Sequence, residues 1–582
     1  MNRRTFIAQA AALPLAASVP TPCLALSGAP RTAVRDLKAG PDLSRYHLTL
    51  DRVLHGRNPE YTADFLLEDI LATSGRRFTN FSGDLSGRWI GALATSASVF
   101  GDSFPRLDEV VRGVIAHQHP DGYFGSTFHY DHPDDNDLAL LWGNGRLLVG
   151  LMEYHALTND PDVFSSARRL GDFLIRIAPR FNSQAMADAF NADHFASSYV
   201  CWTQQTEGLA GLYAVTRDDR YRDLCAAIAS RIERRPGDHV HGYLTSLRGT
   251  LDLYRLTGDS SHLHQVIAAS KDIRTSGDAL ITGGVPERWS PKRERTEGCA
   301  ECDWLRLNLG LYRATGDQLY LNTAQDTYFN EFSMNQFVSG DFGHARLDPA
   351  GVPETVYVRA WWCCTLHGLR AFADVHRAAF RVVSDDVYFE FPIDSQIHSE
   401  TFSARAESAL TKTGTIRIEI EKTNAARSLI VSKPAWADSV TVTHNGKPVS
   451  SARMQGLSAG DVVVVHYGMS QRVGSHASGA GEAPGQSVHF GPWLLGASSS
   501  ANPGYFNELY RDNLLELTSA SRQTRRSDSV FEVPQAATAA GYIPAEFPDQ
   551  PAQVELRAVA EQTANQPETW QLVFRKNPND AT

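Results

Sequence analysis

The heptapeptide Leu253-Tyr254-Arg255-Leu256-Thr257-Gly258-Asp259 decides the fold class, because it recurs with small changes through the first two thirds of the chain. Similar segments occupy residues 154–160, 212–218 and 311–317. Each copy closes an apolar-periodic run. Leu and Tyr occupy the last turn of a helix, Gly or Asn takes the left-handed conformation that ends it, and Asp can cap the next helix. The pattern predicts a series of helix–turn–helix junctions.

The spacing of the copies indicates how these helices are arranged. They lie about 40 to 60 residues apart, which is the length of one or two helical hairpins. This spacing is compatible with an open solenoid or with a closed toroid of helix pairs. Residues 40–384 have room for roughly twelve helices of ordinary length, and this favours closure. We expect an (α/α)6 helical barrel with a cleft formed by the loops at one end.

The sequence changes character near residue 385, where short alternating segments replace the helical pattern. Val387–Phe391 and Thr415–Ile420 alternate apolar and polar residues, as half-buried strands do. Asn445-Gly446 is a strong hairpin turn between two such runs. The chain is therefore expected to be a multidomain α + β protein, in which a β-sandwich (385–520) and a small C-terminal β unit (521–582) follow the barrel.

The first residues resemble an export signal. Arg3 and Arg4 precede the apolar stretch Ala8–Ala17, and small residues continue to about residue 29. This pattern is typical of a bacterial twin-arginine signal, which predicts a periplasmic or secreted protein with residues 1–29 as signal. Gln9 and Pro14 interrupt the apolar stretch, which is too short for a membrane span of ~20 residues.

Composition excludes several classes of protein. The 582 residues are 42% hydrophobic and 21% charged, as in ordinary globular proteins and unlike disordered or collagenous chains. The net charge of −11, with no basic cluster, argues against a nucleic-acid partner. An aromatic content of 10% suits a protein that binds an oligo- or polysaccharide. Nothing in the sequence indicates the oligomeric state.

Four of the seven cysteines form two close pairs, Cys299 with Cys302 and the vicinal Cys363-Cys364. Clustered thiols in an exported protein need protection, and a bound metal would provide it. Spacing alone allows a four-thiolate zinc site. It equally allows Glu297 to replace Cys302 as the fourth ligand, and the thiols can also be four unconnected core residues.

Several of these motifs together resemble glycoside hydrolase family 127, which contains the β-L-arabinofuranosidases. They are Glu297-Gly298-Cys299, Cys363-Cys364, the segment Thr282–Trp289 and the repeated helix ends. The resemblance spans roughly residues 45 to 500. It implies that Zn²⁺ is bound by Glu297, Cys299, Cys363 and Cys364.

The same resemblance implies the chemistry. Cys363 would be the nucleophile and Glu287 the general acid/base of a retaining exo-glycosidase that releases β-L-arabinofuranose or a related sugar from polysaccharide. A group that acts as acid and then as base needs a pKa near neutrality, which burial of Glu287 against Trp289 could provide.

Further residues are candidates for substrate binding. His239 and His241 lie where the family has a substrate-contacting His at a helix start, and the sequence does not choose between them. Trp142 can line the cleft or belong to the core. Asp121 lies in a segment resembling a family loop, although Asp-Gly is also an ordinary turn.

Two departures from the family pattern fall at expected substrate contacts. Arg146 stands where the family often has His, and Thr365-Leu366-His367 replaces Pro-Pro-Asn. Because Arg146 could pair with a carboxylate, an acidic sugar is an alternative substrate, and His367 is a further candidate contact. The remaining alternatives are a polysaccharide lyase and a noncatalytic glycan-binding protein with a structural zinc.

Overall fold

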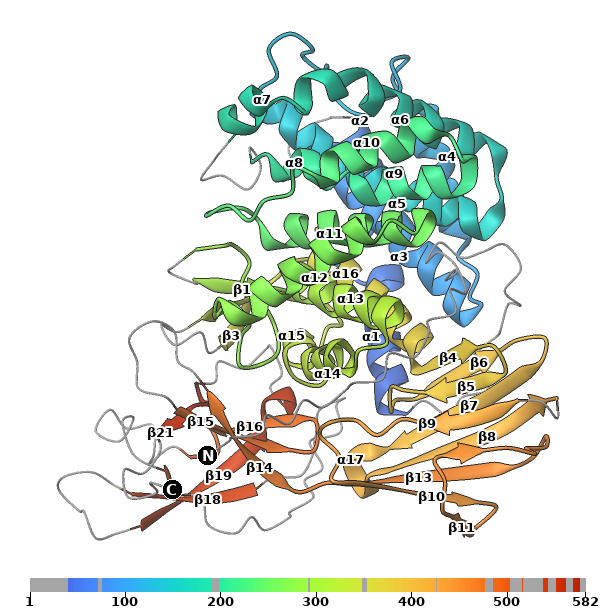
Figure 1. Ribbon diagram of the computed structural model, residues 1–582. Coiled ribbons are helices and arrows are strands. Elements are labelled where there is room, and N and C mark those ends of the chain that lie inside the picture. Colours follow the sequence, from blue (N-terminus) through green and yellow to red (C-terminus); the bar gives the residue numbers. More distant parts are fainter. Residues whose placement is uncertain are drawn as a thin grey trace, which may run out of the picture.

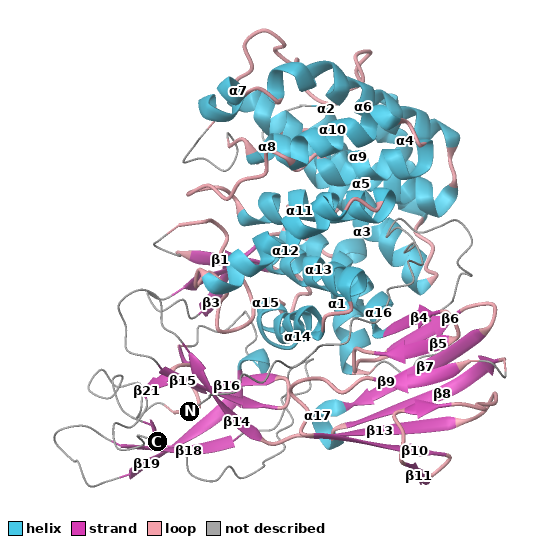
Figure 2. Cartoon of the chain, viewed as in Figure 1, coloured by secondary structure: helices cyan, strands magenta, loops and turns pink. Residues whose placement is uncertain are grey.

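The structure is a computed structural model that describes residues 40–71, 76–190, 198–290, 294–347, 353–424, 427–476, 485–502, 515–516, 537–542, 551–561 and 569–575. The predicted signal, residues 1–29, lies outside these ranges. A helix-rich region comes first and a sheet-rich region follows, as the sequence predicts (Figures 1 and 2). Helices continue to Ala379, and the first strand of the sheet-rich region begins at Phe380.

All four repeated segments end one helix and begin the next. At residues 258 and 316 a glycine with φ of 75° and 71° ends the helix, while Asn159 and Arg217 adopt the same left-handed conformation in the other two copies. The side chain of the following Asp accepts hydrogen bonds from the first backbone N–H groups of the next helix in each copy. These junctions confirm the prediction from the repeat.

Six helices contact one another in sequence, and the last also contacts the first. Helix α13 is buried continuously from Gly298 to Tyr312, as expected for a helix surrounded by others. The six, in order of contact, are α3 (Asp84–Phe100), α5 (Asp135–Thr158), α9 (Thr206–Thr216), α11 (Val240–Thr257), α13 (Gly298–Thr315) and α16 (Cys364–Ala379).

Each of these helices also contacts a further helix that follows it in the chain or, for α16, comes from the start of the described chain. The partners, in the same order, are α4 (Pro105–Ala116), α6 (Pro161–Phe181), α10 (Asp219–Ala229), α12 (Ser260–Thr275), α14 (Gln318–Thr327) and α1 (Pro41–His55). Shorter helices complete the region: α2 (Ala63–Leu71), α7 (Gln184–Ala189), α8 (Val200–Thr203), the π-helix η1 (Tyr328–Phe332) and α15 (Ser333–Asn335).

A three-stranded antiparallel sheet lies within the helical region, and the sequence did not predict it. It contains β1 (Arg295–Glu297), β2 (Gly343–Leu347) and β3 (Pro353–Arg359), in the order β1-β2-β3. β1 is only three residues long, too short for its periodicity to be recognised. It leads directly into α13, so the sheet places Glu297 beside His344 of β2.

Two sheets follow the helices. The six-stranded sheet contains β6 (Ser395–His398), β7 (Phe402–Ala409), β8 (Thr415–Thr423), β10 (Ser439–His444), β11 (Lys447–Val449) and β13 (Val462–Gly468), with the short helix α17 (Leu410–Thr413). The four-stranded sheet contains β4 (Phe380–Val383), β5 (Asp386–Phe389), β9 (Ser428–Val431) and β12 (Arg453–Met454). The predicted Asn445-Gly446 hairpin joins β10 to β11, with φ of 48° and 76°.

A third sheet joins segments that are far apart in the sequence. It contains β14 (Gln471–His476), β15 (Gly485–Phe490), β16 (Trp493–Ser498), β17 (Leu515–Glu516), β18 (Ala537–Tyr542), β19 (Pro551–Ala558), β20 (Trp570–Gln571) and β21 (Phe574–Arg575), with the 3₁₀ turn η2 (Val559–Glu561). Strands on both sides of residue 520 therefore pair in one sheet.

Candidate active site

A cavity of about 250 Å³ opens among the N-terminal ends of several of the six contacting helices. Asp84 and Arg88 line it from the first turns of α3, and His241 from the first turn of α11. The remaining lining residues come from α5, from the three-stranded sheet, and from the segments before α3, α11, β1 and α16: Arg77, Phe78, Phe81, Trp142, His239, Glu287, Arg295, Glu297, His344, Val358, Trp362 and Cys363.

Three thiols and a carboxylate meet at the bottom of this cavity. The Sγ of Cys364 lies 3.7 Å from that of Cys299 and 3.5 Å from that of Cys363. Glu297 Oε1 lies 3.6 Å from Cys363 Sγ and 3.9 Å from Cys364 Sγ. Ligands at ~2.3 Å from a tetrahedral metal would be separated by about 3.8 Å. The donor set therefore fits a metal ion in both chemistry and spacing.

The structure shows which of the two cysteines Cys299 and Cys302 lies beside the vicinal pair, a choice that their spacing in the sequence left open. Cys299 and Cys302 both lie on α13 and are fully buried, but only Cys299 contacts the vicinal pair in the distances above. Among the described residues, His344 forms a group with Glu297, Cys363 and Cys364 in which one ligand atom of each lies within 4.8 Å of the others. Neither Cys299 nor Cys302 is part of that group, so His344 is an alternative to Cys299 as the fourth ligand.

The polar surroundings favour one thiolate in the cluster. Burial raises the pKa of Cys363, but hydrogen bonds with Cys299, Cys364 and His344 and the charge of Arg88 outweigh burial and hold this pKa well below its usual value. Burial and the neighbouring thiols raise the pKa values of Cys299 and Cys364. Negative charge therefore concentrates on Cys363, the thiol of the three that lines the cavity.

Two backbone hydrogen bonds, to different segments, hold Glu287 in the same cavity. Its N–H donates to Arg295 O at 2.9 Å, and its carbonyl accepts from the N–H of Val240 at 2.9 Å. Glu287 is 97% buried, and its carboxylate accepts a hydrogen bond from Arg295 Nη2 at 2.7 Å and lies 3.7 Å from His344 Nδ1.

The prediction of a near-neutral pKa for Glu287 is wrong. Burial raises the pKa, as predicted, but the hydrogen bond and charge of His344 and the charges of His239 and Arg295 lower it to about 2. The sequence could not reveal this, because these groups come from different segments. Trp289 is buried nearby, but the cationic neighbours decide the charge state.

His239 and His241 both line the cavity, in different environments. His239 Nε2 lies 3.1 Å from Glu297 Oε2, so this ring contacts a candidate metal ligand. His241 Nε2 lies 3.1 Å from Arg88 Nη2, and its Nδ1 contacts Asp303. Trp142 packs edge-on against both rings and donates from Nε1 to Asp84 at 3.1 Å.

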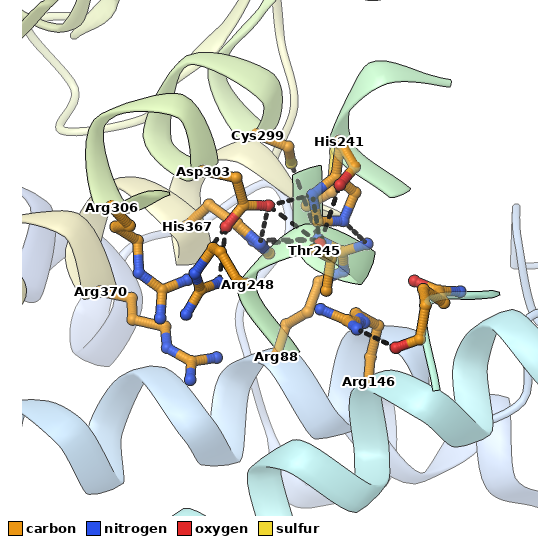
Figure 3. Close-up of polar contacts among 12 residues, drawn as sticks. Arg88, Arg146, His241, Thr245, Arg248, Cys299, Asp303, Arg306, His367 and Arg370 are labelled. Carbon is orange, nitrogen blue, oxygen red and sulfur yellow. Dashed lines mark hydrogen bonds and ion pairs between the residues drawn. The ribbon is translucent and has the colours of Figure 1, made fainter. Parts of the chain in front are cut away.

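A buried network of polar contacts joins the cavity residues Arg88 and His241 to Asp303 (Figure 3). Asp303 contacts His241 on one side and Arg248 Nη1, at 2.8 Å, on the other. Because a guanidinium can only donate, His241 Nε2 accepts from Arg88 and its Nδ1–H is directed to Asp303. Burial lowers the pKa of His241 to about 3, so the ring is neutral at neutral pH.

Three predicted substrate contacts lie outside the cavity lining described above. Asp121 is half-exposed in a turn, as its Asp-Gly sequence allows, and accepts from Tyr130 at 3.2 Å. Arg146 is buried on α5 with its charge directed to Glu207 at 3.4 Å. His367 is buried on α16 behind the cavity and contacts Arg88 Nη1 at 2.9 Å.

Sequence reasoning did not single out Arg88, Asp303, His344 or Arg295 for a role. Asp303 follows Cys302 directly, and its position in a segment rich in thiols and carboxylates was the available signal. The other three lie in segments without a motif, and only the fold brings them to the cavity.

Comparisons with known proteins agree with this arrangement. A family model described as the beta-L-arabinofuranosidase, GH127 catalytic domain matches residues 74–377. Ara127N-Se, a GH127 beta-L-arabinofuranosidase from Geobacillus stearothermophilus T6, has a TM-score of 0.70 at 15% identity, over 93% of this chain and 100% of that chain. The GH127 beta-arabinofuranosidase BT3674 has a TM-score of 0.68 at 17% identity, over 93% and 95%. No curated protein matches the chain. At these identities the structural likeness shows the fold.

Proposed function

The chain belongs to the GH127 family of β-L-arabinofuranosidases and is a glycoside hydrolase, and from this premise we propose that it is a retaining exo-enzyme that releases β-L-arabinofuranose or a related sugar from oligo- or polysaccharide. The observation that carries the proposal is the single cavity whose walls contain both Cys363 and Glu287. Its volume of about 250 Å³ is below the range for drug-sized ligands, which suits one terminal sugar.

The proposed metal is Zn²⁺, bound by Glu297, Cys299, Cys363 and Cys364. The support is the three-sulfur, one-oxygen donor set, in which the distances from Cys364 to Cys299, Cys363 and Glu297 and from Cys363 to Glu297 are 3.5 to 3.9 Å. Zn²⁺ would keep the thiols deprotonated and oriented. Since three thiolates and a carboxylate exceed the charge of the ion by two, the buried Arg88 beside Cys299 would balance part of that excess.

In the proposed first step, Cys363 Sγ attacks the anomeric carbon while Glu287 donates a proton to the departing glycosidic oxygen. The carbon–oxygen bond breaks, and a thioglycosyl enzyme forms. In the second step water attacks the same carbon, its proton passes to Glu287, and the thiolate leaves. Two inversions at the anomeric carbon give net retention.

Proton donation requires a change around Glu287, because a carboxyl group with a pKa of about 2 is ionised at neutral pH. The Arg295 side chain is 39% exposed and can turn toward solvent. We assign the donation step to the substrate-filled cavity, in which the leaving group separates Arg295 from Glu287. His239, His241 and Trp142 would then contact the bound sugar from the opposite wall.

The fold proposal is an (α/α)6 barrel. Its support is that six helices contact one another in sequence, that α16 contacts α3, and that each has a partner helix outside the series. The pairing of β15 with β21 and of β16 with β19 and β20 supports a terminal unit beginning near residue 471 instead of 521. Export through a twin-arginine signal stays a proposal, and none of the helices that the structure describes is long and apolar enough to span a bilayer.

Because the chain belongs to a glycoside hydrolase family, the two other hypotheses, a polysaccharide lyase and a noncatalytic glycan-binding protein, have no support. The acidic-sugar alternative loses its original basis, because the Arg146 charge is already directed to Glu207.

The direct test uses a panel of synthetic glycosides that includes β-L-arabinofuranosides and uronides. Glu287→Gln and Cys363→Ala are each expected to lose more than a thousandfold in kcat/KM, while Glu287→Gln keeps its bound metal by elemental analysis. Proton NMR of the first product should show retention. A Cys363→Ala protein with full activity, or an inverted product, contradicts the mechanism.

A further inference from the structure

We propose that Arg77, Phe78 and Trp362 form a leaving-group subsite that selects substrates with a carboxylate, as in a uronic acid residue, next to the released sugar. This inference rests on the proposed function and names the class of its substrate. It places selectivity for acid at the mouth of the cavity and not at Arg146.

The residues at the two ends of the cavity differ in their exposure to solvent. Cys363 and Glu297 are 94% and 97% buried at its closed end. Arg77 is exposed, and Phe78 and Trp362 are partly exposed, although all three line the same cavity. The released sugar must reach Cys363, so the part of the substrate that stays behind lies toward these more exposed residues.

The position of Glu287 supports the same assignment, because the group that protonates the glycosidic oxygen must face the leaving group. Glu287 lies 3.7 Å from His344, whose ring stacks on Trp362 with centroids 6.2 Å apart. Trp362 therefore continues the wall on the side of Glu287. Its indole ring provides an apolar surface of the kind against which sugar C–H faces pack.

A cation completes this surface. The Arg77 guanidinium lies over the Phe78 ring at 4.8 Å and over the Trp362 ring at 5.9 Å. Within the described parts of the chain, its side chain has these aromatic contacts and no carboxylate within ion-pairing distance. The other two arginines of the cavity are paired with carboxylates, Arg88 with Asp84 and Arg295 with Glu287. Arg77 can thus receive an anion from the substrate without first leaving an ion pair among the described residues.

The backbone conformation of Phe78 is consistent with a ligand-binding site. Phe78 has φ of 70°, which is uncommon for a bulky side chain. Such conformations cost free energy and cluster where a ligand is held. Here the conformation accompanies the contacts of Phe78 with Phe81 and Trp362, which fix the rings beneath the guanidinium.

The test compares β-L-arabinofuranosides of 4-hydroxybenzoate and of its methyl ester, which differ in one negative charge. The ratio of kcat/KM values, carboxylate over ester, should be about fivefold higher in wild type than in Arg77→Gln. The wild-type ratio should fall in 0.5 M NaCl, because salt screens a partly exposed ion pair. Taking the ratio within each protein cancels the intrinsic difference between the two leaving groups.

The matched control is Arg453→Gln, which removes an exposed arginine from β12 in the sheet-rich region and changes the net charge equally. It should keep the wild-type ratio. Equal ratios in wild type and Arg77→Gln overturn the subsite and leave the proposed function intact.

If neither arabinofuranoside is cleaved, the proposed sugar is wrong, and binding of the leaving group tests the subsite separately. Saturation-transfer NMR should then show binding of methyl galacturonate to wild type, weaker binding of its methyl ester, and no such difference in Arg77→Gln. An equal signal for acid and ester in wild type overturns the inference.

Discussion

Arg88 Nη1 lies 3.7 Å from Cys299 Sγ, so a guanidinium that is 95% buried rests against the thiol cluster. Its position is fixed on the other sides by Asp84 at 2.7 Å and by the rings of His241 and His367. A cation held in this way has little freedom to move, and it stabilises negative charge on the sulfurs in a medium of low dielectric constant.

Arg88→Met is expected to weaken metal retention by roughly 10- to 100-fold, since residues that support metal ligands have effects of this size. Competition with a chromogenic chelator measures the affinity without reference to activity. Arg45→Met is the control, because Arg45 is buried but hydrogen-bonds to Ser333 and Gln336. Equal metal affinity in wild type and a folded Arg88→Met protein would show that Arg88 does not support the ligands.

The two cysteines of α13 should differ in metal binding. Cys299→Ser is expected to lose most of the metal, because Cys299 contacts Cys364 at 3.7 Å, whereas Cys302→Ser should keep one equivalent. Elemental analysis after gel filtration gives the stoichiometry. Loss of metal from both Cys299→Ser and Cys302→Ser would instead favour the four-thiolate ligand set, and retention in Cys299→Ser would contradict both sets.

Asp303→Asn should be strongly destabilising. Asp303 is fully buried and contacts His241, Arg248 and Arg306, so the substitution removes one of the two carboxylates that pair with each arginine and the acceptor of the His241 Nδ1–H. The expected loss is about 3 to 5 kcal/mol in the free energy of unfolding, measured by urea denaturation.

A matched control for that substitution is Asp272→Asn, because Asp272 is 57% exposed and pairs with Arg234. Its loss should stay below about 1 kcal/mol. Similar losses in both variants would mean that the buried network has no special role in stability.

His376 should make folding sensitive to acid. Burial lowers its pKa to about 4 from 6.5, so between these values the unfolded chain takes up a proton that the folded protein does not. The contribution of His376 to stability is therefore complete above about pH 6.5 and decreases as the pH falls toward 4, by about 1.4 kcal/mol per unit.

His376→Phe should remove this part of the pH dependence, and urea midpoints at about pH 7 and about pH 5 measure it. The comparison with wild type isolates one group among the several that titrate. The exposed His132→Asn should follow wild type. An unchanged slope in His376→Phe would contradict the assignment.

Local signals in the sequence were sufficient for the helix junctions and the hairpin. The ends of α11 and α13 at Gly258 and Gly316 follow from backbone conformation and capping, which depend on neighbouring residues. The Asn445-Gly446 turn has the same local origin. The candidate ligands also appear in the sequence, since thiols and a carboxylate form two compact motifs.

Only the tertiary structure decided which of these groups act together. It brings Arg88, His344 and Arg295 to the cavity from three separate segments, directs Arg146 to Glu207, and sets the charge state of Glu287. Contacts between distant segments and the burial they create leave no local pattern, because the distance and dielectric environment that govern electrostatics arise only when the chain is packed.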